Sequence, residues 1–155
     1  VRLQKLLMSP IGFLVGRRYQ RENMAQTFGR IFGPQTQPSQ QEMDGFWRMM
    51  EFNQGPKVMH LLIRYIAERK VQRDRWVDAM QRTEVPMRVI DGAVDPVSGA
   101  HMVARYRELI PQADTVLLDN IGHYPQVEAP DQVLEHYLDF RSVCAGSEHS
   151  LAVEC

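Results

Sequence analysis

The sequence predicts an α/β protein with a helical first half and a small parallel sheet in its second half. Apolar residues at helical spacing run through residues 1–82, whereas short runs of β-branched and apolar residues lie at 86–92 and 115–119. The strand–helix–strand order predicts a parallel pair joined by a right-handed crossover. Two parallel strands covered by helices do not form a stable sheet, so we expect them to be the edge of a larger one.

Length and composition set the broad class. The chain has 155 residues, 44% apolar and 24% charged, which suits one soluble globular domain. Its net charge of −1 leaves no basic surplus for nucleic acid. No apolar stretch is long enough to span a membrane, and the first residues lack the apolar core of a signal peptide. Two cysteines provide no disulfide framework, so we expect a reducing, cytoplasmic compartment.

The first half predicts a series of helices separated by turns. A helical pattern ends at the Gly-Pro pair 33–34. Ser39 followed by Glu42 gives the capping-box pattern that begins another helix. That helix ends at residues 53–56 (Asn-Gln-Gly-Pro), and residues 58–80 predict one long helix or two short ones.

The second half predicts two strands and two helices in alternation. Strands are expected at 86–92 and 115–119, and helices at 99–110 and 131–141. The apolar periodicity is lost after that, and residues 142–155 are expected to form an irregular tail.

A short polar motif follows each predicted strand. These are residues 92–96 (Gly-Ala-Val-Asp-Pro) and residues 122–130 (Gly-His-Tyr-Pro-Gln-Val-Glu-Ala-Pro). Loops beyond the carboxyl ends of parallel strands line the active crevice of an open sheet, so Asp95 and His123 are expected at neighbouring strand ends. A carboxylate beside an imidazole fixes its tautomer and stabilises the imidazolium, as in a nucleophile–His–acid triad. The alternative for Asp95 is an ordinary turn residue before proline.

Residues 85–140 resemble the carboxyl-terminal segment of the α/β-hydrolase fold. That family carries its acid in a Gly-x-x-Asp-Pro pattern and its base in a Gly-His-x-x-x-x-Glu-x-Pro pattern, and both are complete here. The helical first half is similar to the cap that the family inserts over its site. Residues 32–38 (Phe-Gly-Pro-Gln-Thr-Gln-Pro) and 123–126 (His-Tyr-Pro-Gln) are similar to the haloalkane dehalogenase, epoxide hydrolase and mesoderm-specific transcript-like branch.

The resemblance implies a partial domain and a reaction. Residues 1–82 would be the helical cap, residues 83–141 the last two strands and flanking helices of the hydrolase sheet, and residues 142–155 the tail. Asp95 would orient His123, which would act as the general base. The substrate would be a small apolar ester, epoxide or haloalkane, with water as the second substrate and with neither cofactor nor metal.

A nucleophile elbow is missing from the sequence. The elbow needs a Gly-x-nucleophile-x-Gly pattern, yet the two glycine pairs with this spacing are centred on Leu14 and Ile31. The family's elbow precedes its cap, so we expect it upstream of Val1, within a longer protein, and we expect this chain alone to be inactive. The alternative is a non-catalytic truncated relative that acts as an interaction module or self-associates through its exposed sheet edge.

Several other side chains suit either a pocket or ordinary packing. Trp47 and Trp76 could line a substrate pocket or bind a halide, but their apolar helical stripes favour packing within the cap. Tyr19 and Tyr65 could take part in opening an epoxide ring, or they could pack on amphipathic helices. Methionines could form an adaptable apolar pocket or fill the core; the candidates are Met49, Met50 and Met59. Metal-ligand spacing is absent among the remaining histidines: His60, His101, His136 and His149.

Overall fold

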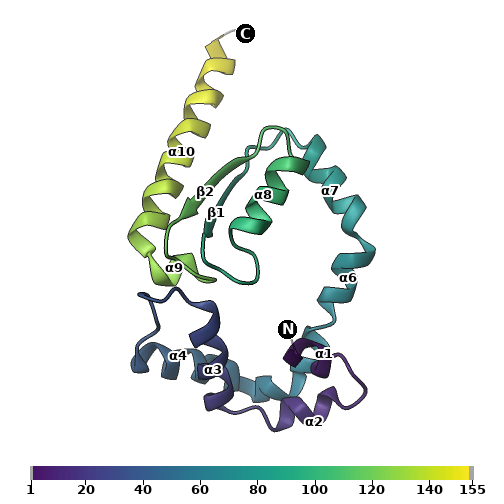
Figure 1. Cartoon of the computed structure of the whole chain (residues 1–155). Helices are drawn as coiled ribbons and strands as arrows, with labels where there is room; N and C mark the ends of the chain where they lie inside the picture. Colours follow the sequence, from purple (N-terminus) through teal and green to yellow (C-terminus); the bar gives the residue numbers. More distant parts are fainter. Residues whose placement is uncertain (1, 154–155) are drawn as a thin grey trace. The chain divides into compact units, whose positions relative to one another are not determined.

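The computed structural model describes residues 2–153, with side-chain environments for residues 3–146 (Figure 1). The chain forms two compact units. The first contains the residues up to Gly29 together with Pro38–Asp78, and the second contains Arg30–Gln37 together with the residues from Ala79 onward. Segment 30–37 thus belongs to the second unit, although it lies in the sequence between two parts of the first.

The first unit is helical, as the apolar spacing predicts. Its elements are α1 (Arg2–Leu7), α2 (Gly12–Arg17), α3 (Arg21–Ile31), α4 (Gln40–Glu51), the 3₁₀ helix η1 (Phe52–Val58), α5 (Met59–Leu62), α6 (Tyr65–Val71) and α7 (Arg73–Arg82). The last residues of α3 and of α7 already belong to the second unit. The predicted capping box is confirmed, because the Ser39 side chain accepts from the Glu42 amide and the Glu42 carboxylate accepts from the Ser39 amide. The prediction of one or two helices over 58–80 is wrong: three form there, with breaks that no glycine or proline marks.

Aromatic pairs stabilise the first unit from within. Phe28 and Phe46 meet edge to face with ring centroids 5.1 Å apart, and Tyr19 lies 6.5 Å from Trp47. Met24, on α3, is almost completely buried. This packing joins α3 to α4.

The second unit is built on two parallel strands, β1 (Arg88–Gly92) and β2 (Asp114–Leu118). They pair in register, with Arg88 opposite Asp114 and Gly92 opposite Leu118. The crossover is α8 (Ala100–Leu109), and α9 (Pro125–Glu128) and α10 (Pro130–Val153) follow β2. α8 packs on both strands and α10 packs on β1, and Figure 1 shows the two helices on opposite sides of the strand pair. The predicted strand–helix–strand–helix order is confirmed.

A small apolar core fixes the end of β2 and the loop that follows it. Leu118, Ile121 and Ala129 are buried together. Partly buried side chains from both strands and from α10 pack against this cluster: Ile90, Val116 and Val133. The core therefore lies directly beneath the loops at the carboxyl ends of the strands.

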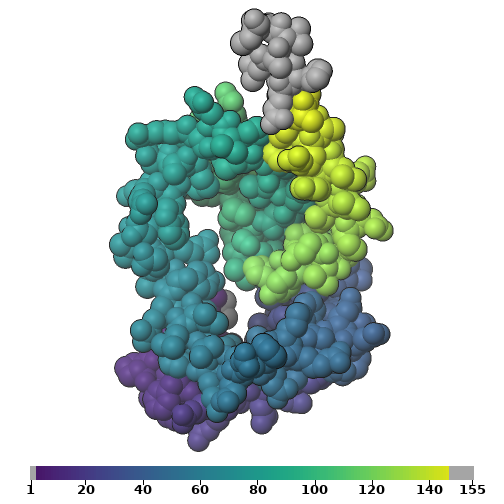
Figure 2. Space-filling model, turned by 180° about the vertical axis from the view of Figure 1, so that it is seen from behind, coloured from purple at the N-terminus to yellow at the C-terminus, as the bar shows by residue number. Residues whose placement is uncertain are grey.

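The tail predicted to be irregular from residue 142 is helical instead. α10 continues from Pro130 to Val153, and Figure 2 shows its surface in yellow-green along the second unit. The prediction was wrong because lost apolar periodicity reports lost packing and not lost helix propensity. Residues 145–152 contain Ala, Glu and Leu, which favour helix, and one glycine costs only about 1 kcal/mol. Within the described range, no helix has both the length and the apolar character needed to cross a bilayer.

Arg88 joins both strands to α10. Its guanidinium donates to Asp114 Oδ2 at 2.7 Å, to Asp139 Oδ2 at 2.6 Å and to the His136 carbonyl at 3.0 Å. Only 14% of its side chain is exposed. Replacing Arg88 by a residue with an uncharged side chain therefore leaves two carboxylates and one carbonyl without this hydrogen-bond donor.

We expect Arg88→Met to lower the melting temperature of the chain clearly, because three acceptors lose one shared donor. The matched control is Arg105→Met, which removes an exposed ion pair to Glu108 within α8 and should have little effect. Thermal unfolding followed by circular dichroism measures both. Equal shifts for the two variants would mean that Arg88 does not join these elements.

Candidate functional site

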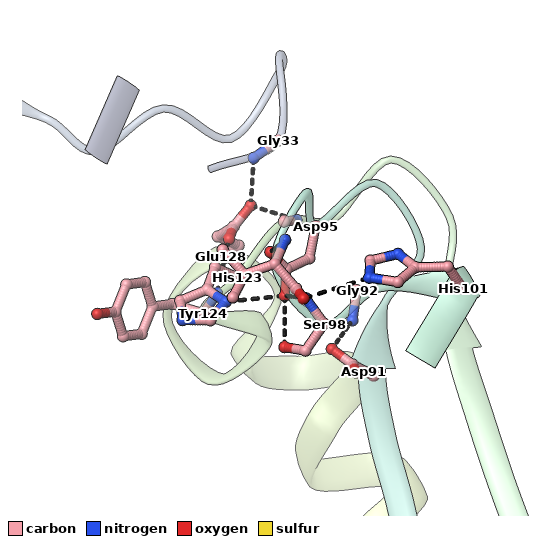
Figure 3. A network of polar contacts seen from close by, with 11 residues as sticks. Gly33, Asp91, Gly92, Asp95, Ser98, His101, His123, Tyr124 and Glu128 are labelled. Atoms are coloured by element: carbon pink, nitrogen blue, oxygen red, sulfur yellow. Dashed lines mark hydrogen bonds and ion pairs between the residues drawn. The ribbon is translucent and has the colours of Figure 1, made fainter. Parts of the chain in front are cut away.

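The two predicted site residues lie in the loops that leave the carboxyl ends of β1 and β2. Asp95 follows β1 and His123 follows β2, and the structure brings them together (Figure 3). His123 Nδ1 lies 2.8 Å from Asp95 Oδ2. The Asp95 side chain is fully buried, whereas 29% of the His123 side chain is exposed. The parallel register of the strands places the two loops side by side.

The Asp95 side chain accepts hydrogen bonds from the turn that follows it and also contacts His123. Its Oδ1 accepts from the Val97 amide at 2.7 Å, the Asx geometry typical of a turn. Its Oδ2 accepts from the Ser98 amide at 2.9 Å and the Ser98 hydroxyl at 2.7 Å, as well as facing His123. Burial acts to raise the pKa of Asp95, but the hydrogen bonds from His123, Val97 and Ser98 outweigh it and hold that pKa below its usual range. The carboxyl group is therefore ionised at neutral pH.

His123 is oriented by both its ring and its backbone. An ionised carboxylate only accepts, so the Nδ1–H donates to Asp95 and the Nε2 lone pair is left as the basic site. The His123 amide donates to the Ile31 carbonyl at 2.8 Å, which anchors the residue to segment 30–37. The Tyr124 ring lies edge-on to the imidazole, 5.0 Å away. This arrangement can accept a proton at Nε2 and stabilise the resulting imidazolium.

A second buried carboxyl group, Asp91, lies in β1 below this pair (Figure 3). Its Oδ1 accepts from the Gly92 amide at 2.8 Å. Burial raises the pKa of Asp91, and the negative charge of Asp95 adds to that effect. Its sequence signal is an acidic residue that directly follows the apolar pair Val89–Ile90 within a short strand, and Asp91 was not among the predicted site residues.

We expect Asp91→Asn to raise the melting temperature at neutral pH. A carboxyl group whose pKa is raised by folding contributes stability below its unfolded pKa and loses it as pH rises through the folded value. The charged form is thus the costly one, and Asn removes it. Thermal melts between about pH 4 and pH 8 should show the gain shrinking toward acid. Asp119→Asn, an exposed carboxyl after β2, is the control, and an equal gain there would contradict the explanation.

The other aromatic candidates lie in the first unit. Trp47 lies beside the buried Tyr19 with the two rings tilted, in agreement with packing, whereas Trp76 and Tyr65 are exposed. The Arg69 guanidinium lies 5.9 Å from the Tyr65 ring centroid. Among the described residues, no cluster of three or more His, Cys, Asp or Glu side chains could hold a metal ion.

An apolar pocket of about 440 Å³ lies within the first unit. Its walls come from α3, α4, η1 and α5, and every lining residue except one glycine is apolar and large. The lining residues are Met24, Phe28, Phe46, Met49, Met50, Phe52, Gly55, Met59 and Leu62. The three methionines considered from the sequence therefore share one pocket, and flexible thioether side chains let such a pocket adapt to its occupant.

Comparison with known proteins connects this geometry to a family. No family model matches the chain. It is 39% identical over 133 residues to LipZ of Mycobacterium tuberculosis, a protein named as a hydrolase, and 36% identical over 112 residues to the mesoderm-specific transcript protein of Mus musculus. These matches cover 86% and 71% of this chain but 46% and 33% of the relatives.

Solved structures agree on the fold. A thermophilic esterase from Thermogutta terrifontis superposes with a TM-score of 0.62 at 22% identity, over 86% of this chain and 51% of the esterase. The chain thus spans about half the length of the hydrolases that it matches. The shared fold and the sequence relatives show that this chain is part of an α/β-hydrolase fold.

Proposed function

We propose that this chain supplies the general base and the orienting acid of a hydrolase whose nucleophile lies outside these 155 residues. The observation that carries the proposal is the 2.8 Å contact between His123 Nδ1 and the fully buried Asp95 carboxylate. Two strand-end loops converge to make this contact. Such a pair is the part of a nucleophile–His–acid triad that activates the nucleophile.

The proposed reaction assigns a defined step to each group. His123 Nε2 takes the proton from the attacking hydroxyl, or from the attacking water when the nucleophile is a carboxylate. Asp95 stabilises the imidazolium that forms. When the nucleophile is a hydroxyl, the imidazolium gives its proton to the leaving alkoxide and an acyl-enzyme remains; His123 then takes a proton from the attacking water and returns it to the released hydroxyl. When the nucleophile is a carboxylate, the leaving group departs in the first step, the water deprotonated by His123 cleaves the resulting ester, and the imidazolium protonates the alkoxide that is released.

An ester of a small apolar acid or alcohol is the substrate class that we favour over an epoxide or a haloalkane. This choice is supported by LipZ, which is named as a hydrolase, and by the Thermogutta protein, which is named as an esterase. In this proposal residues 1–82 contribute the cap and residues 83–141 part of the catalytic core.

A chimera tests the proposal. The region of LipZ that matches this chain is replaced by this chain, so that LipZ provides the rest of the domain. We expect the chimera to hydrolyse short-chain aryl esters faster than epoxides or haloalkanes, and this chain alone to hydrolyse none of them. LipZ itself is the positive control. A folded chimera that is inactive on all three classes, where LipZ is active, would refute the proposed function.

Exposed apolar surface on α10 favours a second candidate, an interaction module. Leu134, Tyr137 and Leu138 lie on one face of the helix and are 53%, 51% and 56% exposed. Within the described residues, each strand also has one edge without a neighbouring strand. Light scattering of the purified chain tests this candidate. A stable oligomer together with an inactive chimera would favour it, and a monomer would count against it.

A further inference from the structure

The carboxylate of Glu128, at the end of α9, accepts four hydrogen bonds. Its Oε2 accepts from the Gly33 amide at 2.7 Å, the Gly122 amide at 2.8 Å and the Thr36 hydroxyl at 2.6 Å. Its Oε1 accepts from the Tyr124 amide at 3.0 Å. Figure 3 shows this carboxylate between Gly33 and the loop of His123. Two segments more than 80 positions apart in the sequence thus share one acceptor.

The donors surround His123 on both sides along the chain. Gly122 and Tyr124 are its immediate neighbours, and both donate to Glu128. The His123 amide donates to Ile31, in segment 30–37. Hydrogen bonds therefore fix the backbone of Gly122, His123 and Tyr124, although these residues lie in a loop and not in a β-strand.

Close packing of the backbone leaves no room for side chains next to the His123 loop. A Cβ atom on Gly122 would lie 2.3 Å from the Ile31 carbonyl oxygen, and one on Gly92 would lie 2.0 Å from the Gly122 carbonyl oxygen. Neither glycine has a positive φ. These glycines are required for close approach, so the end of β1, the His123 loop and segment 30–37 pack main chain against main chain.

We propose that Glu128 is a positioning residue, which holds the His123 loop against segment 30–37 and thereby keeps the imidazole on Asp95. This inference rests on the proposed function, because the position of the imidazole matters for catalysis only if His123 is the general base. The geometry supports this: His123 itself is held at Nδ1, at its amide and by the Tyr124 ring, and Glu128 fixes both neighbouring peptide units. Burial acts to raise the pKa of Glu128, but the four hydrogen bonds together outweigh burial and hold that pKa below its usual range. The accepting carboxylate is therefore ionised at neutral pH.

Glu128→Ala in the full 155-residue chain tests the inference without any activity measurement. We expect amide hydrogen exchange at Gly33, Gly122 and Tyr124 to accelerate by roughly tenfold or more, the scale of a lost hydrogen bond to a charged group. The Nδ1–H signal of His123 in proton NMR should broaden or vanish as the ring leaves Asp95. The matched control is Glu135→Ala, an exposed residue of α10. Unchanged exchange and an unchanged signal in Glu128→Ala would overturn the inference.

Thr36→Val provides a milder variant if Glu128→Ala does not fold. It removes one donor and keeps the shape, so a smaller acceleration at Gly33 and Gly122 is expected, while β1 amides keep wild-type exchange. No change at those amides would overturn the inference. In the LipZ chimera, Glu128→Ala should lower kcat with little change in KM. A disturbed His123 signal with unchanged kcat would support the positioning role and refute the catalytic function of His123.

Discussion

His123→Ala in the LipZ chimera is expected to lower kcat for an aryl ester by roughly 10⁴-fold or more, the scale seen when a triad base is removed. Without the imidazole, no group accepts the proton of the nucleophile, and no imidazolium forms opposite the buried Asp95 carboxylate. Because the loss affects the transition state and not substrate binding, KM should change little. Steady-state kinetics of purified chimeras measure both quantities.

The control for this variant is His136→Ala. His136 lies on α10, and its backbone carbonyl rather than its ring accepts from Arg88. Its removal should leave kcat unchanged. A His123→Ala chimera that stays folded and retains its kcat would exclude His123 as the general base.

Asp95→Asn is the second large effect, with an expected loss of roughly 10³- to 10⁴-fold in kcat. The amide keeps the shape of the side chain, but it cannot accept at both oxygens from His123, Val97 and Ser98 together. The imidazole then loses the partner that sets its tautomer and stabilises its charge. Asp119→Asn, after β2, is the matched control and should leave kcat unchanged.

The low pKa of Asp95 adds a pH dependence to this prediction. A carboxylate whose pKa is lowered on folding contributes stability above its unfolded pKa, and that contribution is lost as pH falls through the folded value. The wild-type chain should therefore lose stability below about pH 4, the usual range of an aspartate. Asp95→Asn should show a flatter acid limb in thermal melts from pH 6 to acid. An unchanged acid limb would mean that the pair contributes no folding free energy.

Local patterns predicted the strands and the Asp95–His123 contact from the sequence. Short β-branched runs at 86–92 and 115–119 predicted β1 and β2, and the rule that parallel strands end at one edge of the sheet placed Asp95 beside His123. The strands follow from residues adjacent in the sequence, and the contact follows once two successive strands are assumed to pair in parallel across one crossover helix.

Other features depend on contacts that no local pattern reveals. Glu128 belonged to the recognised motif, but its four hydrogen bonds require segment 30–37 to pack beside the His123 loop. The burial of Asp91 likewise depends on neighbours that arrive from elsewhere in the chain. The helical continuation of α10 was missed because its sequence signal is propensity, which apolar periodicity does not report.

The double variant Asp95→Asn/His123→Ala in the LipZ chimera tests most directly whether the two residues act as one unit. If Asp95 works only through the imidazole, its replacement costs nothing once the imidazole is gone, so the double variant should have the same kcat as His123→Ala alone. Losses that multiply, so that the double variant is slower than His123→Ala by the full factor of Asp95→Asn, would contradict the account.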